Sequence, residues 1–129
     1  MKVLFATSNP AKVRNYKEKL LKSGIELLTL KDIDISGKNI IIRCDYNVPM
    51  EGNVIKDNSK IVKSLPTLNY LLDNGCKIVI LSHLGRVKSE EDKEKNTLKY
   101  VAKELANLLG KEIKFVDKCI GERLKEYVN

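Results

Sequence analysis

The feature that most constrains the fold is a regular alternation of short apolar runs with stretches of helical periodicity. The apolar runs that we expect to be strands are residues 2–7, 25–30, 39–44, 76–82 and 112–116. The expected helices are residues 10–24, 59–74, 96–109 and 120–128. Parallel strands need a long, usually helical connection, so this alternation predicts an α/β fold. We expect a three-layer sandwich with a mostly parallel, Rossmann-like sheet of about five strands.

The expected helices carry residues that start and stop helices. Pro10 opens the first one and Gly24 follows its end. Asn58 or Ser59 can cap the second, and Pro66 must kink that helix or split it in two. The apolar face of the second helix is formed by Ile61, Leu65, Leu68 and Leu72.

Two polar segments are longer than simple connections require. "DYNVPMEGNVIKDN" (45–58) follows an expected strand, and its length and its Pro and Gly content indicate a functional loop. "KSEEDKEKN" (88–96) mixes charges of both signs, and we expect a solvated loop there.

Charge and cysteine content narrow the function classes. The formal net charge of +7 favours anionic partners, but the five Tyr and two Phe are scattered and do not interleave with a basic stripe as in nucleic-acid binders. Cys44, Cys76 and Cys119 form no C-x-x-C pair, and no segment approaches the ~18 apolar residues of a membrane span. We expect one cytoplasmic α/β domain over residues 1–129, with no metal site and no nucleic-acid or membrane partner.

Polar side chains gather where the expected parallel strands end. Asp45 and Asn47 follow one strand, His83 and Arg86 follow another, and Lys60 lies in the first turn of the helix between them. Ligands of open parallel sheets bind at the carboxyl ends of the strands. These residues could surround a phosphate and a carboxylate, although each of them could equally cap or solvate its own loop.

Three segments, "IIIRCDYNVPM", "DNSKIVKSLPTLNYLLDNGCKIVILSHLGRVK" and "VAKELANLLGKEIKFV", closely resemble the N-terminal half of phosphoglycerate kinases. The resemblance runs from about Lys31 to the last residue, and we treat residues 34–129 as the kinase-like segment. It implies a site that binds 3-phosphoglycerate, formed by Asp45, Tyr46, Asn47, Lys60, His83, Leu84, Gly85 and Arg86. Lys60 stands where the family usually has an arginine close to the transferred phosphoryl group, so it is the implied catalytic residue.

The resemblance also implies a role in glycolytic phosphoryl transfer, with Mg-ATP as the donor in the full family. The chain ends at Asn129, before the family's later substrate arginines and its nucleotide-binding lobe. We therefore expect residues 1–129 to bind no cofactor and to be inactive alone, with a C-terminal kinase lobe as the partner that would complete the enzyme.

The first part of the chain, "VLFATSNPAKVRNYKEKLLKSGIELLTLKDI", resembles a different family, the inosine triphosphatases, which are purine nucleoside triphosphate pyrophosphatases. The resemblance covers residues 1–33 and implies phosphate contacts from Thr7, Ser8, Asn9 and Lys12, at a helix N-terminus that favours anions. The acidic metal ligands of that family do not follow. The chain therefore resembles a fusion, natural or engineered, of two incomplete domains.

Three functions remain open at this point. The chain is a kinase-like acceptor half that binds 3-phosphoglycerate, a nucleoside triphosphate pyrophosphatase-like phosphate binder, or a structural chimera without activity. In each case we expect the N-terminal strand to pair with the kinase-like strands, because a shared sheet would bury its apolar side chains.

Overall fold

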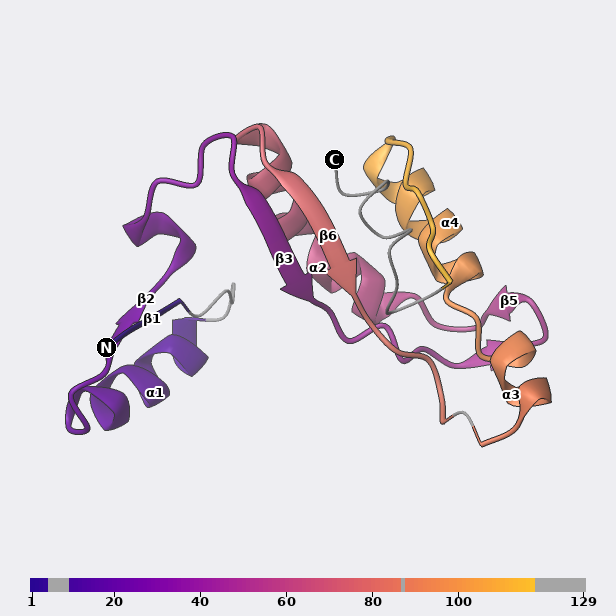
Figure 1. Ribbon diagram of the computed structural model, residues 1–129, viewed down its shortest axis with the longest axis horizontal. Coiled ribbons are helices and arrows are strands. Elements are labelled where there is room, and N and C mark those ends of the chain that lie inside the picture. Colours follow the sequence, from indigo (N-terminus) through magenta and orange to yellow (C-terminus); the bar gives the residue numbers. More distant parts are fainter. Residues whose placement is uncertain (5–9, 87, 118–129) are drawn as a thin grey trace. The chain divides into compact units, whose positions relative to one another are not determined.

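The computed structural model describes residues 1–4, 10–86 and 88–117, and it has the expected α/β composition (Figure 1). The described residues divide into two compact units. The first unit comprises Met1–Asn39 with Pro66–Lys77, and the second comprises Ile40–Leu65 with the described residues from Ile78 onward. The strands and helices are, in chain order, β1 (Lys2–Leu4), α1 (Pro10–Leu21), β2 (Glu26–Leu28), a 3-10 turn (Leu30–Asp32), β3 (Asn39–Arg43), β4 (Met50–Glu51), β5 (Val54–Ile55), α2 (Ser59–Asp73), β6 (Lys77–Leu81), α3 (Glu90–Lys95) and α4 (Lys99–Leu109).

In the first unit, β1 and β2 form a parallel pair in which Lys2 lies opposite Glu26. The helix α1 connects them and begins at Pro10, as the sequence predicts. It ends ahead of Gly24, whose φ of +71° lies in the left-handed region that favours glycine. The expected pairing of the N-terminal strand with the kinase-like strands is wrong for the described residues, because β1 and β2 form a sheet of their own.

In the second unit, β3 pairs with β6, and the two arrows run in the same direction (Figure 1). The expected α/β class with parallel pairing is confirmed. The sheets are smaller than the five strands expected, since the described strands form three sheets of two strands each. Residues 112–116, which we expected to be a strand, have no strand structure, because no neighbouring strand among the described residues supplies the ladder hydrogen bonds that an isolated apolar run needs. The expected helix 120–128 lies outside the described residues.

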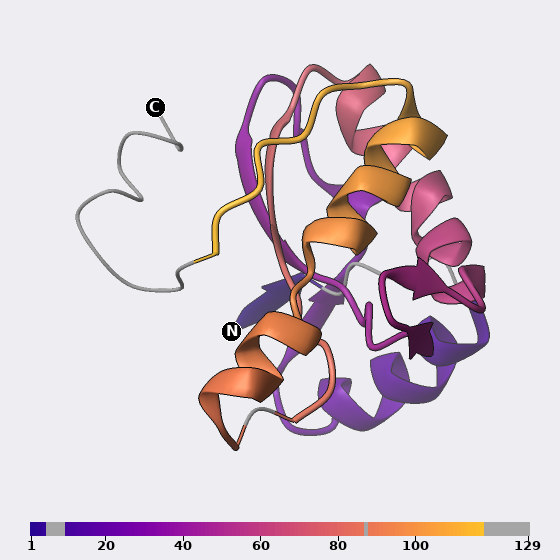
Figure 2. The same ribbon diagram turned by 90° about the vertical axis from the view of Figure 1, so that its right-hand side faces the viewer.

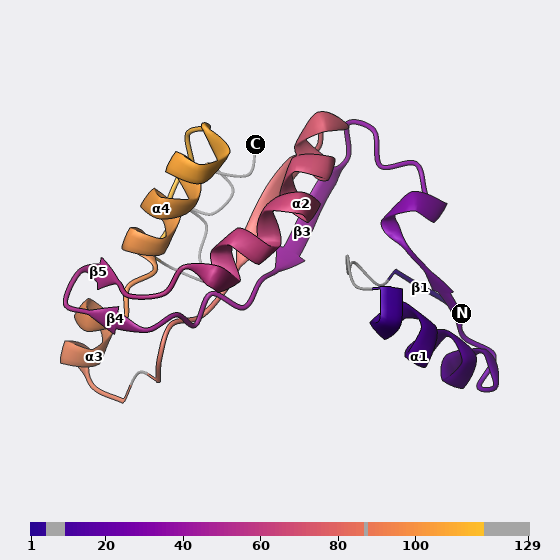
Figure 3. The ribbon, with the colours of Figure 1, turned by 180° about the vertical axis from the view of Figure 1, so that it is seen from behind.

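The loop 45–58 contains an element that the sequence analysis missed. β4 and β5 form an antiparallel hairpin in which Met50 lies opposite Ile55. Gly52 makes the tight turn possible, because its φ is +57°. The hairpin leads directly into α2, as Figure 3 shows from behind.

The charged segment 88–96 is not the solvated loop that we expected. It forms α3, which Ser89 caps by accepting a hydrogen bond from the backbone N–H of Asp92. The Asp92 carboxylate in turn accepts from the backbone N–H of Ser89, which completes a capping box. Capping and charge therefore stabilise a helix that has no apolar periodicity.

Within the described ranges, no helix combines the length and the apolar content needed to cross a bilayer.

The helix α2 continues from Ser59 to Asp73 with Pro66 inside it, so the proline does not split it. On the predicted apolar face, Ile61 and Leu68 are fully buried, whereas Leu65 and Leu72 are half-buried. Leu71, outside the predicted face, is also fully buried. This burial outweighs the single backbone hydrogen bond that the proline removes. At its N-terminus, Asp57 accepts from the Ser59 N–H at 2.8 Å.

The second unit has its own core. The helix α4, the longer of the two orange helices in Figure 2, contacts β5. Asn58, directly before α2, donates from Nδ2 to Glu104 Oε1 of α4 at 2.9 Å. Its buried apolar side chains are Tyr46, Val48, Ile61, Leu84, Val101 and Leu105. Two of them, Tyr46 and Leu84, belong to the polar segments that the sequence singles out. The candidate site is therefore built directly on the core.

We predict that Leu105→Ala destabilises the second unit by about 2–5 kcal/mol, because it leaves a cavity where a side chain is only 2% exposed. Leu108→Ala on the same helix is the matched control, since Leu108 is 40% exposed and the helix propensities change equally. Urea denaturation followed by circular dichroism measures both. Equal losses for the two variants would contradict the assignment of α4 to the core.

Candidate functional site

The candidate site begins where β3 ends. The Lys60 Nζ donates to Asp45 Oδ2 at 2.9 Å and to the backbone oxygen of Asn47 at 3.0 Å. The other carboxylate oxygen of Asp45 accepts from the Asn47 backbone N–H at 3.1 Å. Side-chain charge thus ties the first turn of α2 to the loop after β3. The Lys60 and Asp45 side chains remain 43% and 65% exposed, so the pair contributes little to stability.

The surroundings of Asp45 lower its pKa below the ordinary value. The largest cause is the hydrogen bond from Lys60, followed by the backbone N–H of Asn47, and the charges of Lys60 and His83 add to both. Asp45 is therefore ionised near neutral pH and acts as a hydrogen-bond acceptor.

A second link joins this loop to the segment after β6. The side-chain oxygen of Asn47 accepts a hydrogen bond from the backbone N–H of Gly85 at 3.0 Å. His83 and Arg86, on either side of this contact, are both exposed. Among the described residues, the imidazole of His83 and the guanidinium of Arg86 have no hydrogen-bond or ion-pair partner. The structure brings Asp45, Asn47 and Lys60 together through direct bonds, and the bond between Asn47 and Gly85 links them to the segment that carries His83 and Arg86.

Tyr46 and Leu84 differ from the other predicted site residues because they are buried, at 3% and 6% exposure. The Tyr46 hydroxyl lies 2.8 Å from Ser64 Oγ. Ser64 uses its own proton to donate to the Ile61 carbonyl at 2.7 Å, so the tyrosine is the donor. Burial raises the pKa of the Tyr46 phenol far above its ordinary value. The side chain of Tyr46 thus anchors the loop to α2.

Gly85 lies against a residue that the sequence analysis did not single out. A Cβ at this position would lie 2.8 Å from Oδ1 of Asn96, and the φ of Gly85 is +60°. Asn96 also donates from Nδ2 to the Arg86 carbonyl at 3.4 Å. Glycine is therefore required both for the backbone conformation and for the close approach of Asn96. Neither Asn96 nor Ser82, which bonds to the loop after β3, carries a sequence signal that would single it out.

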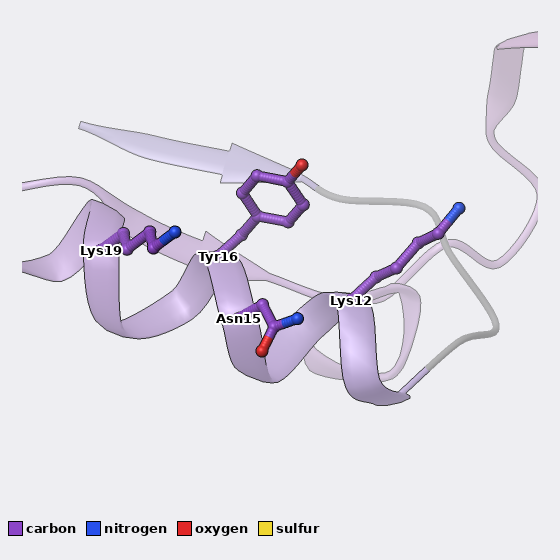
Figure 4. Close-up of a pocket in the computed structure, with 4 residues that line it drawn as sticks. All are labelled: Lys12, Asn15, Tyr16 and Lys19. Atoms are coloured by element: carbon purple, nitrogen blue, oxygen red, sulfur yellow. The ribbon is translucent and has the colours of Figure 1, made fainter.

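Of the phosphate-binding residues proposed for the N-terminal segment, Lys12 lies within the described residues. Thr7, Ser8 and Asn9 lie outside the described residues. Lys12 lines a surface hollow on α1 together with Asn15, Tyr16 and Lys19 (Figure 4). Among the described side chains, no group of three or more His, Cys, Asp or Glu residues could hold a metal ion.

The arrangement around Lys60 and Arg86 suits an anionic ligand with hydroxyl groups. Asp45 can accept from a hydroxyl, and Lys60, His83 and Arg86 can donate to oxyanions. Arg86 offers two parallel donors to one phosphate or carboxylate, whereas Lys60 offers a point charge.

Comparisons with known proteins agree on one family. The family model described as "Phosphoglycerate kinase" matches residues 30–129. The phosphoglycerate kinase of Latilactobacillus sakei is 49% identical over 102 residues, which cover 78% of this chain and 25% of the relative. The phosphoglycerate kinase of Fervidobacterium nodosum is 46% identical over 104 residues, which cover 81% of this chain and 26% of the relative. The chain thus spans about a quarter of the length of these relatives.

Solved structures give the same result. The phosphoglycerate kinase of Pyrococcus horikoshii OT3 has a TM-score of 0.68 at 29% identity, covering 77% of this chain and 24% of that one. The phosphoglycerate kinase of Coxiella burnetii has a TM-score of 0.60 at 33% identity, and the match covers 65% of this chain and 22% of that one. The family match covers residues 30–129, which confirms the kinase resemblance expected from about Lys31 to the last residue. Residues 1–29 lie outside it, so their resemblance to inosine triphosphatases stays a prediction.

We predict that Gly85→Ala destabilises the chain more than Gly52→Ala, although both glycines have a positive φ. The left-handed conformation alone costs a non-glycine residue about 1–2 kcal/mol, and a Cβ at residue 52 meets nothing within 4 Å. At residue 85 it must also displace Asn96 and break its hydrogen bond, for about 1 kcal/mol more. Urea denaturation measures the difference. In an Asn96→Ala background the two penalties should become equal, and a persistent gap would exclude Asn96 as the cause.

We predict that Lys60→Met raises the pKa of Asp45 toward its ordinary value, because it removes the largest cause of the lowering. The pKa of Asp45 in the folded chain lies below that in the unfolded chain. Its contribution to stability is therefore present above the unfolded-state pKa and is lost as the pH falls through the folded-state pKa. An NMR titration of the Asp45 carboxyl carbon measures the shift. Lys63→Met is the control, and an equal effect from both variants would refute the direct contact.

Proposed function

The chain belongs to the phosphoglycerate kinase family, and we propose that residues 34–129 form its acceptor-substrate part, which binds 3-phosphoglycerate. The observation that carries this proposal is the Lys60 ammonium between Asp45 and the Asn47 backbone, joined through Asn47 to Gly85. These bonds hold two distant segments of the chain together and leave His83 and Arg86 exposed beside them. Such a site can receive an anion without rebuilding its loops.

Each site residue has a role that follows from its chemistry. Arg86 and His83 bind the phosphate of the ligand, because their donors are exposed and free within the described residues. Asp45 accepts from the substrate hydroxyl, and Asn47 spaces the two loops. Lys60 binds the carboxylate that receives the phosphoryl group. Because lysine lacks the planar fork of arginine, it stabilises the developing charge less specifically.

The complete reaction needs parts that residues 1–129 do not supply in our proposal. Phosphoryl transfer requires a donor nucleotide, with Mg²⁺ bridging its phosphates, in line with the acceptor. In a full-length relative these would come from a second lobe, so a C-terminal kinase lobe is the proposed partner. The N-terminal residues 1–33 are proposed as the remnant of an inosine triphosphatase-like segment fused to this part.

We predict that 3-phosphoglycerate shifts the amide signals of residues 45–47 and 83–86 in an NMR titration. We expect a dissociation constant no better than ~1 mM, or about 4 kcal/mol of binding free energy, that weakens with added salt. Arg86→Ala should abolish most of the binding, and Arg86→Lys should keep part of it. Arg14→Ala on α1 is the control, since it removes the same charge from the other unit. If no amide shifts at millimolar ligand, or if both Ala variants weaken binding equally, the proposed site is wrong.

We predict that purified residues 1–129 neither phosphorylate 3-phosphoglycerate with ATP nor release pyrophosphate from inosine triphosphate. The first expectation rests on the proposal that the nucleotide-binding lobe lies outside residues 1–129, and the second on the missing carboxylate cluster in the sequence after the "TSNPAK" segment. A coupled ADP assay and a pyrophosphate assay measure the two activities. Turnover that co-purifies with the chain and is lost in Lys60→Ala or Lys12→Ala would overturn the corresponding expectation.

A further inference from the structure

Ser82 directly follows β6, at the point where the hydrogen-bonded pairing of β3 with β6 ends and both chains continue as loops. The Cys44 N–H donates to the Leu81 carbonyl at 3.0 Å, which continues the strand pairing. One residue further, the Ser82 Oγ donates to the Cys44 carbonyl at 2.9 Å and accepts from the Tyr46 N–H at 3.0 Å. The single proton and one lone pair of this hydroxyl are thus both used. The Ser82 side chain therefore forms the hydrogen bonds that a backbone strand partner would otherwise provide.

The two backbone groups that Ser82 binds flank Asp45. They fix the chain immediately before and immediately after the residue whose carboxylate contacts Lys60. Ser82 also directly precedes His83 in the sequence. One half-buried hydroxyl therefore couples the loop that carries Asp45 and Asn47 to the segment that carries His83 and Arg86.

We propose that Ser82 is a positioning residue that holds Asp45 and Asn47 in register with His83 and Arg86 for the acceptor substrate. The proposal rests on the proposed function, and it assigns no contact between Ser82 and the ligand. The effect on affinity comes from preorganisation, because a loop that is already ordered loses less conformational freedom when the ligand binds.

The other anchors of this loop act at different atoms. The Tyr46 phenol bonds to Ser64 and holds the side chain against α2. The Asn47 side chain bonds to Gly85 and spans the two loops. Neither binds the backbone groups on both sides of Asp45. Loss of the Ser82 hydroxyl would leave the Cys44 carbonyl and the Tyr46 N–H without this partner, in a part-buried place where unpaired polar groups are costly.

The test compares Ser82→Ala with Ser82→Thr, which keeps a hydroxyl. Ser36→Ala is the control, because it removes a serine hydroxyl from the other unit, where Ser36 binds Asp34 through its backbone N–H. An NMR titration with 3-phosphoglycerate gives the affinities, and amide hydrogen exchange without ligand reports the Tyr46 and Gly85 N–H groups. We expect at least fivefold weaker binding and at least tenfold faster exchange at both amides in Ser82→Ala. Ser82→Thr should recover most of both, and Ser36→Ala should change neither.

The outcomes separate the two proposals. If the native chain does not bind 3-phosphoglycerate, the proposed function fails and the substrate-positioning role fails with it, even if the exchange data still show that Ser82 orders the loops. If the native chain binds and a folded Ser82→Ala binds equally well, only the positioning role is overturned. If binding weakens but exchange at Gly85 is unchanged, the coupling of the two segments is refuted. Should Ser82→Ala not fold, Ser82→Cys, with similar volume and a weaker donor, replaces it in the same comparison.

Discussion

The structure of the candidate site depends on the need to satisfy backbone polar groups where a parallel strand pair ends. Beyond Arg43 and Leu81 the chains leave the sheet, yet Tyr46 and Leu84 remain buried close by. Buried backbone groups need hydrogen-bond partners, and here side chains provide them. Ser82 binds the backbone around Asp45, and Asn47 binds the backbone of Gly85. The loops are therefore shaped by side chains rather than by secondary structure.

The charged groups of the site fall into two kinds. Lys60 and Asp45 already satisfy one another, so an anionic ligand must compete with a carboxylate for the ammonium group. His83 and Arg86 are exposed and have no such competitor in the described part of the chain. In the proposed binding of a phosphate, electrostatic attraction would therefore start at the segment after β6, and Lys60 would contribute once the ligand replaces Asp45 as its partner. Exposure keeps both contributions sensitive to salt.

The sequence predicted correctly the elements that have a strong local pattern. It predicted wrongly those whose structure depends on contacts with other segments. The apolar spacing of Ile61 and Leu68 correctly predicted a buried helix face. The prediction of a loop for segment 88–96 was wrong because Ser89 and Asp92 cap a helix there, although its mixed charges show no apolar periodicity. The run 112–116 has strand-like composition, but a strand forms only when a neighbour accepts its hydrogen bonds. No sequence pattern supplies that neighbour.

The sequence by itself determined the α/β class, the family of residues 30–129 and the identity of the polar residues after β3 and β6. Those properties follow from local periodicity and from motifs that lie within short segments. Only the tertiary structure decided that β1 pairs with β2, that Tyr46 points into the core and that Asn96 closes over Gly85. It also decided that Ser82 bonds to Cys44, 38 residues away in the sequence, and so joins the two loops of the site. Hydrogen bonds between such distant segments depend on where folding brings their atoms.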